Sequence, residues 1–88
     1  MISSRQAKIE VQLLSRPGCH LCEQMKESLQ KATEGLDVLL TVVDISLDDE
    51  LASRFENDIP VVFVNGNKAF KQRATVKGLR RRLLLEST

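Results

Sequence analysis

Both cysteines of the chain lie in the stretch Arg16-Pro17-Gly18-Cys19-His20-Leu21-Cys22-Glu23, three residues apart. An apolar run, Ile9 to Leu14, precedes this stretch, and a helical pattern, Glu23 to Thr33, follows it. The Pro17-Gly18 pair ends the apolar run and indicates a loop. A Cys-x-x-Cys pair between a strand and a helix is typical of a redox-active dithiol. We therefore interpret the remainder of the chain as the scaffold that holds this pair.

The length and composition predict one small globular domain. The chain has 88 residues, which suits a single domain over 1–88 with an ordered core of about residues 9–86. The formal net charge of +1 gives no indication of a nucleic-acid or membrane partner. Residues 1–8 are polar and resemble a frayed lead-in without a signal-peptide pattern, and no run is long enough to span a membrane. Two closely spaced cysteines fit the cytoplasm, where disulfides are usually transient and catalytic. We therefore expect a cytoplasmic protein, and we expect it to be a monomer.

The hydrophobic pattern predicts an alternation of strands and helices. Strands are expected over 9–14, 36–45, 61–64 and 67–70. The first helix is expected from Cys19 to just before Gly35. A second helix is expected over 49–55 after a Ser46 or Asp48 cap, and a third after a Thr75 cap. The run over 36–45 is almost unbroken in its apolar character, which favours a strand buried on both faces. The Asn65-Gly66 pair indicates a tight hairpin. The sequence therefore predicts an α/β fold of order βαβαββα, with a four-stranded mixed sheet in the order 2-1-3-4 and helices on both faces.

The position of each cysteine predicts its chemical role. Cys19 is expected at the N-terminal end of a helix, where free N–H groups and the helix dipole favour a thiolate, the attacking species in disulfide exchange. Cys22 is expected one turn further along on the apolar side, where desolvation favours the neutral thiol. The spacing places the two Cα atoms within the roughly 4.4–6.8 Å that a disulfide requires. The residues alone also fit two buried structural cysteines, because cysteine packs as a small hydrophobic side chain.

His20 lies between the two cysteines and has two interpretations. As an imidazolium it would stabilise the Cys19 thiolate, and otherwise it is an exposed residue of the first helical turn. A zinc site is disfavoured, because a tetrahedral structural site takes four ligands. The chain offers only three soft ligands, Cys19, Cys22 and His20, so no metal ligand is assigned.

Three segments carry a family resemblance. They are Ser15 to Cys22, the run Val42-Val43-Asp44-Ile45, and the run Ile59-Pro60-Val61-Val62-Phe63-Val64-Asn65-Gly66. Together with the element order, they make the chain resemble the glutaredoxin branch of the thioredoxin superfamily over roughly residues 9 to 86. The resemblance is strongest to the short bacterial glutaredoxin-like proteins with a Cys-His-Leu-Cys motif.

The resemblance implies a set of roles. Cys19 matches the nucleophilic cysteine and Cys22 the resolving one. Pro60 matches a cis-proline that faces the pair, and the backbone of Ile59 would pair with an incoming peptide or glutathione by strand addition. Arg16 matches a basic position that helps to hold a glutathione carboxylate. The family's Gly-Gly pair and acidic residue after the hairpin are missing from 69–73, which predicts weak glutathione binding.

The leading functional hypothesis is a thiol–disulfide oxidoreductase that reduces disulfides or mixed disulfides through Cys19 and Cys22. Its expected partners are a disulfide-containing protein or a glutathione mixed disulfide, with a thioredoxin-type protein as a further candidate reductant. No tightly bound cofactor is expected, and glutathione is a possible co-substrate. The alternatives are a glutathione-dependent glutaredoxin, a glutathione-linked iron–sulfur carrier in which two copies bridge a cluster through Cys19, and a non-catalytic thioredoxin-like interaction domain.

Overall fold

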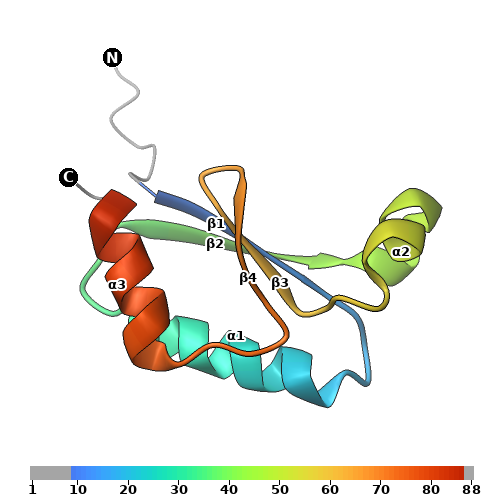
Figure 1. Cartoon of the computed structure of the whole chain (residues 1–88), viewed down its shortest axis with the longest axis horizontal. Helices are drawn as coiled ribbons and strands as arrows, with labels where there is room; N and C mark the ends of the chain where they lie inside the picture. Colours follow the sequence, from blue (N-terminus) through green and yellow to red (C-terminus); the bar gives the residue numbers. More distant parts are fainter. Residues whose placement is uncertain (1–8, 87–88) are drawn as a thin grey trace.

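The computed structural model describes residues 9–86, and the predicted lead-in over 1–8 lies outside this range. Figure 1 shows a single sheet with helices packed around it. The elements follow the predicted order, with one short 3₁₀ turn added before the second helix. Along the chain they are β1 (Ile9–Ser15), α1 (His20–Ala32), β2 (Val38–Asp44), the 3₁₀ turn η1 (Ile45–Leu47), α2 (Asp49–Phe55), β3 (Val61–Val64), β4 (Asn67–Lys71) and α3 (Val76–Glu86).

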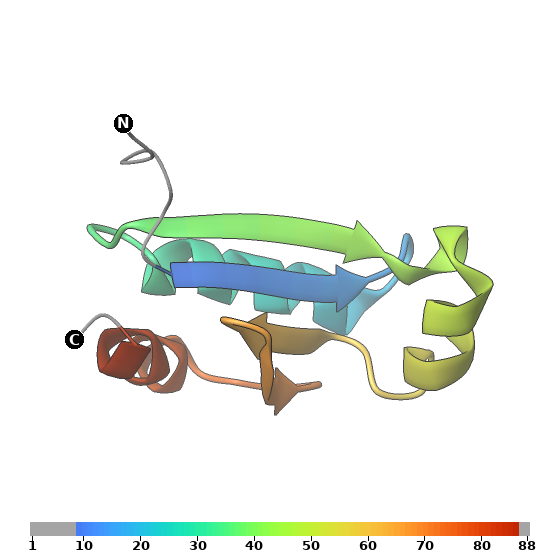
Figure 2. The same ribbon diagram turned by 90° about the horizontal axis from the view of Figure 1, so that it is seen from above.

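The four strands form one mixed sheet in the predicted order β2-β1-β3-β4, which Figure 2 shows from above. The β1 and β2 strands are parallel, whereas β3 runs antiparallel to both β1 and β4. The parallel pair is joined through α1, as a parallel connection requires. The β1 strand is therefore central, and the loop that leaves it leads to Cys19 at the start of α1. No helix within residues 9–86 is both long enough and apolar enough to cross a membrane.

The main core lies between one face of the sheet and the helices α1 and α3. Alternate residues of β1, namely Ile9, Val11 and Leu13, point into this core and are almost fully buried. Met25 and Leu29 of α1 and Leu79 and Leu83 of α3 face them at helical spacing. The apolar face of β1 and the apolar faces of α1 and α3 therefore pack together, which positions α1 against the sheet.

Among residues 9–86, a helix covers the opposite face of the sheet only at one end. There the α2 helix lies beyond the carboxyl ends of β1 and β2, as Figures 1 and 2 show. Its Leu51 and Phe55 pack over a second cluster that contains Leu14 and Val61. Helices thus contact both faces, as predicted, but the second face has a helix only beside the redox motif.

The prediction that residues 36–45 form a strand buried on both faces is wrong. The β2 strand is an edge strand, and Leu39 and Val42 are 54% and 44% exposed. Its apolar run reflects the β-branched and leucine side chains that suit a strand, not complete burial. The strand order β2-β1-β3-β4 leaves β2 at one edge of the sheet, with β1 as its single neighbour among the described strands.

The turns and caps use the residues that the sequence indicates, with one shift. Asn65 and Gly66 have φ values of 49° and 84°, which is the left-handed pair of a type I′ hairpin turn. Asp48 caps α2, and Thr75 Oγ1 accepts the Gly78 N–H at 2.9 Å at the start of α3. The α1 helix ends at a Thr33 cap, so Gly35, with a φ of 77°, lies one residue further from the helix end than predicted.

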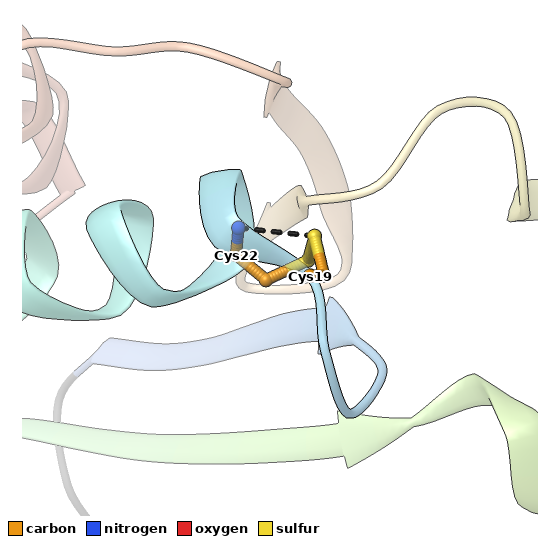
Figure 3. Close-up of a disulfide and its surroundings, with 2 residues drawn as sticks. All are labelled: Cys19 and Cys22. Carbon is orange, nitrogen blue, oxygen red and sulfur yellow. Dashed lines mark hydrogen bonds between the residues drawn. A yellow bond between two sulfur atoms is a disulfide. The ribbon is translucent and has the colours of Figure 1, made fainter.

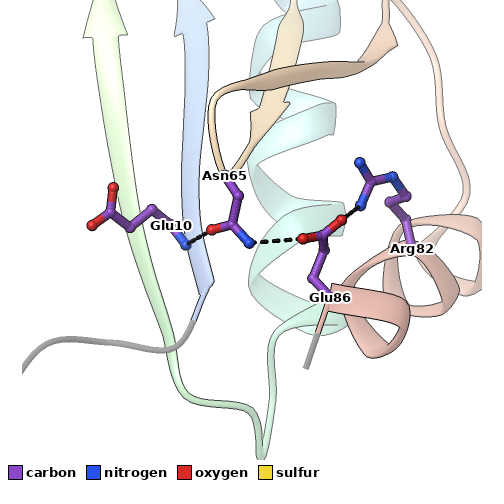
Figure 4. Close-up of polar contacts among 4 residues, drawn as sticks. All are labelled: Glu10, Asn65, Arg82 and Glu86. Carbon is purple, nitrogen blue, oxygen red and sulfur yellow. Dashed lines mark hydrogen bonds and ion pairs between the residues drawn. The ribbon is translucent and has the colours of Figure 1, made fainter. Parts of the chain in front are cut away.

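The hairpin turn also ties β1 to the end of α3 (Figure 4). Asn65 exchanges two hydrogen bonds with the backbone of Glu10, at 2.7 and 2.9 Å, and its side-chain amide donates to Glu86 at 2.8 Å. Arg82 pairs with the other oxygen of the Glu86 carboxylate. The Asn65 hydrogen bond, followed by Arg82, holds the pKa of Glu86 below its ordinary value of 4.5.

A second contact joins α3 to the end of α1. Arg80 Nη1 donates to the carbonyl oxygens of Ala32 at 3.1 Å and Glu34 at 2.7 Å. The last carbonyls of a helix have no partner within the helix, so a cation from another element is well suited to them. Arg80 therefore joins the two helices that cover the main core.

We predict that Arg80→Met destabilises the fold by about 1–2 kcal/mol, because it keeps the apolar stem but removes two charge-assisted hydrogen bonds. The measurement is the free energy of unfolding from urea denaturation. The matched control is Arg81→Met, since Arg81 is the next residue of the same helix and is exposed. The control is expected to change the stability by less than about 0.5 kcal/mol. Equal effects of the two substitutions would show that the Arg80 contacts contribute no stability.

Candidate active site

The two cysteines lie together at the start of α1 (Figure 3). Cys19 is the residue immediately before the helix, and Cys22 lies in its first turn. Their Cα atoms are 5.2 Å apart, and the two sulfur atoms are joined as a disulfide. The separation falls within the range that a disulfide requires, so the pair closes on the helix as it stands.

Cys19 is the N-cap of α1. Its backbone is extended, with φ −90° and ψ 106°, and its Sγ accepts the Cys22 N–H at 3.1 Å. This is the position that an oxygen of Ser, Thr or Asp takes in an ordinary helix cap. In the reduced protein, a thiolate at the same place would receive this N–H and would lie at the positive end of the helix dipole. The local structure therefore favours negative charge on Cys19.

The two cysteine residues differ in their exposure to solvent. Cys22 is 2% exposed and belongs to the buried cluster beneath the motif, whereas Cys19 is half-buried. A partner can therefore approach Cys19 more readily than Cys22. The geometry assigns unequal roles to the two cysteines, one reachable and one protected.

The cluster beneath the motif brings Ile59, the residue before Pro60, to the cysteine pair. Ile59 packs in one group with Cys22, Leu14 and Val61, and Cys19 borders the same group. The Ile59–Pro60 peptide bond is cis, as predicted, and Pro60 is fully buried. Segments about forty residues apart in the sequence are thus joined into one site.

The structure leaves only part of the Ile59 backbone open to the pairing that the sequence predicts. Its N–H is already used, because it donates to the carbonyl oxygen of Phe55 at 3.1 Å, just beyond the end of α2. Within residues 9–86 the Ile59 carbonyl accepts no hydrogen bond. Only the acceptor half of the predicted strand-type pairing is therefore available in this conformation.

Arg16 and His20 lie at the motif, but within residues 9–86 neither side chain forms a hydrogen bond with the Cys19 sulfur. Arg16 is exposed, its carbonyl accepts the Cys19 N–H at 3.4 Å, and its side chain makes no hydrogen bond or ion pair within the described part of the chain. The His20 ring points along the helix, with Nε2 3.2 Å from Gln24 Nε2. The arrangement favours the interpretation of His20 as an exposed first-turn residue.

The segment after β4 also belongs to the site, and the sequence did not indicate this. The Gln72 N–H donates to the Pro60 carbonyl at 2.6 Å, and its side-chain amide donates to the carbonyl of Asn57 at 3.2 Å. Gln72 has a φ of 67°, an uncommon value for a residue other than glycine. Glutamine carries no turn signal, so residue type alone could not reveal this bend. A pocket of about 120 Å³ lies between residues 72–74 and the first turns of α1.

Comparison with known proteins gives the family. Residues 10–84 match the family described as Glutaredoxin-like domain (DUF836). The chain belongs to this glutaredoxin-like family. A relative in Dictyostelium discoideum, "Glutaredoxin-like protein YDR286C homolog", is 32% identical over 71 residues, which cover 74% of this chain and 66% of the relative. The matched stretch thus spans slightly less than two thirds of that relative's length.

Solved structures support the predicted fold. The X-ray structure of Northeast Structural Genomics target protein XcR50 from X. campestris has a TM-score of 0.73 at 28% identity, over 85% of this chain and 96% of that chain. A thioredoxin variant from Halobacterium salinarum NRC-1 has a TM-score of 0.70 at 13% identity, over 93% and 77%. The second likeness concerns the fold alone. The predicted family and the thioredoxin-like fold are both confirmed, and the Cys-x-x-Cys pair in this fold supports a redox-type function in general.

Proposed function

We propose that this glutaredoxin-like protein is a thiol–disulfide oxidoreductase that acts by dithiol exchange. The observation that carries the proposal is the asymmetric pair at the start of α1. The Cys19 sulfur is half-buried and accepts a helix N–H, while Cys22 is buried one turn away at a Cα distance of 5.2 Å. Disulfide exchange requires an accessible sulfur that favours the thiolate form. It also requires a second, protected thiol that can form a disulfide with the first.

The proposed reaction has two steps. The Cys19 thiolate attacks one sulfur of a substrate disulfide; the substrate S–S bond breaks, and its other sulfur leaves as a thiolate that takes up a proton. A mixed disulfide now joins Cys19 to the substrate. Cys22 then loses its proton and attacks Cys19 Sγ, which forms the Cys19–Cys22 bond and releases the second substrate thiol. Two electrons pass from the protein dithiol to the substrate, which becomes a dithiol.

The cycle needs a reductant for the Cys19–Cys22 disulfide. We propose a dithiol protein of the thioredoxin type, or two molecules of glutathione, whose thiols would become oxidised as the pair is reduced. Such reductants belong to a reducing compartment such as the cytoplasm. The Ile59 carbonyl would accept from the incoming chain, because Ile59 packs in the cluster beneath the pair and its carbonyl accepts no hydrogen bond within residues 9–86.

A protein disulfide fits the site better than glutathione. The segment 69–73 lacks the Gly-Gly pair and the acidic residue that glutaredoxins place there, and its Arg73 adds a positive charge instead. Arg16 would remain as a carboxylate clamp, able to bind in a bidentate manner. Each lost hydrogen bond to a charged group weakens binding by about 1.5–3 kcal/mol, or at least about tenfold in affinity.

The experiment that tests the proposed function replaces each cysteine by serine and measures reduction of a protein disulfide with an external dithiol reductant. Cys19→Ser should abolish reduction, because the attacking sulfur is gone. Cys22→Ser should stop dithiol turnover but leave a mixed disulfide on Cys19, which mass spectrometry detects as an adduct of the substrate mass.

The two serine variants serve as controls for each other, since both remove one thiol from the same motif. Thermal unfolding of each variant and of the reduced wild type shows whether the fold is retained. An adduct on Cys22 in the Cys19→Ser variant, with none on Cys19 in the other, would reverse the assignment. Full activity of both variants would support a non-catalytic interaction domain instead.

We further predict that this protein reduces a small glutathione mixed disulfide at least about tenfold more slowly than a glutaredoxin with the Gly-Gly-acid segment. The physical reason is the loss of backbone hydrogen bonds and of one charge contact to the tripeptide. The two proteins are compared side by side at equal concentration. Equal rates would show that residues 69–73 bind glutathione by another route.

A further inference from the structure

The pocket beside the redox pair has one wall from α1 and one from the segment that follows β4. Leu21, which lies between the two cysteines, begins the α1 wall, and Gln24, Met25 and Ser28 continue it. Residues 72–74 form the other wall, and the Gln72 N–H joins that wall to Pro60 at 2.6 Å. Leu21 and the Gln72–Pro60 hydrogen bond therefore place the pocket next to the site that is proposed to receive the substrate disulfide.

Arg73 is the only charged residue among those that line this pocket. Several neighbouring cations of the C-terminal third have partners: Lys71 lies 3.8 Å from Asp58, Arg80 binds two carbonyl oxygens, and Arg82 pairs with Glu86. Arg73 forms no ion pair or side-chain hydrogen bond with any residue of 9–86. Its charge is thus uncompensated at the edge of a pocket whose other polar lining groups, Gln24, Ser28 and Gln72, are neutral.

The backbone holds this wall in an uncommon conformation. Gln72 has a φ of 67°, and the Arg73 N–H donates to the Lys71 carbonyl at 2.7 Å, which closes a tight three-residue turn around Gln72. A side chain in this region costs free energy and persists only where other contacts fix it. Here the bonds to Pro60 and Asn57 fix it, so Arg73 is placed beside α1 by the same residues that hold the cis-proline.

We propose that this pocket docks an acidic side chain of the protein whose disulfide is reduced, with Arg73 as a specificity-determining residue. The inference rests on the proposed function and names its substrate class: protein disulfides that have Asp or Glu close to the reactive cysteine. A guanidinium offers planar paired donors to a carboxylate, and no other charged group lines the pocket to compete with Arg73 for it. The contact acts on docking and leaves the sulfur chemistry unchanged.

The test uses short peptides with one cysteine activated as a 2-thiopyridyl mixed disulfide, whose neutral leaving group adds no charge. Glu, Gln or Lys is placed at each of three positions on either side of the cysteine. Pre-reduced protein reacts in a single turnover, so no external reductant is needed, and released pyridine-2-thione gives the second-order rate constant. We expect the Glu peptide to react about fivefold faster than the Gln peptide at one or more positions, the effect of a solvent-open ion pair.

The variants separate Arg73 from the general positive charge of the protein. Arg73→Gln should remove the preference for Glu, and Arg73→Glu should shift it to Lys. Arg81→Gln is the matched control, an exposed arginine of α3 that does not line this pocket, and it should keep the preference. About 1 M salt should suppress the preference in the wild type, because exposed charges are screened.

The outcomes distinguish this inference from the proposed function. Equal rates for Glu and Gln peptides at every position, or a preference that Arg73→Gln retains, would overturn the Arg73 subsite while leaving the oxidoreductase intact. If Arg73→Gln slowed the reaction with 2-thiopyridyl glutathione more than the reaction with any Glu peptide, the proposed protein subsite would be overturned. Glutathione would then be the ligand whose carboxylate binds Arg73. No reaction of the reduced wild type with any peptide would overturn the proposed function and the subsite together.

Discussion

The contact between the Cys22 N–H and the Cys19 sulfur, at 3.1 Å, links the chemistry of this protein to its fold. One sulfur both caps the first helix and is the proposed nucleophile. An oxygen cap would complete the helix equally well but could not exchange disulfides. The position of the sulfur depends in turn on β1, because the central strand ends at Ser15 and the short loop with Pro17 and Gly18 delivers Cys19 to the helix start. The connection between β1 and α1 thus fixes the position of the cysteine pair.

The two ends of the molecule have different tasks. At the end away from the cysteines, Arg80 binds the last carbonyls of α1, and Asn65 joins β1 to Glu86 (Figure 4). These polar contacts fix α3 against the main core. At the other end, the smaller cluster under α2 buries Cys22 and Ile59 and leaves Cys19 within reach. A far end held by polar contacts and a near end that leaves Cys19 accessible suit the proposed approach of a partner to one sulfur.

The fold and the redox pair could be predicted because they depend on local patterns. The alternation of β1, the Asn65-Gly66 turn and the Cys-x-x-Cys motif each specify their structure within a few residues. Three features could not be predicted, because they depend on contacts between distant segments. The exposure of β2 follows from strand order, the Ile59 N–H is taken by Phe55, and the bend at Gln72 is held by Pro60 and Asn57. The Arg73 pocket depends on that bend, so it was visible only in the folded chain.

The central claim is that the N-terminus of α1 stabilises the thiolate form of Cys19 relative to the thiol. The most direct measurement is the rate of Cys19 alkylation by iodoacetamide as a function of pH, in a Cys22→Ser variant that has no second thiol. A free cysteine gains its reactivity with a midpoint at about pH 8.5. We predict that the midpoint for Cys19 lies clearly lower, so that the thiol is largely reactive at neutral pH. A midpoint at or above about pH 8.5 would contradict the claim and would place Cys19 among inert structural thiols.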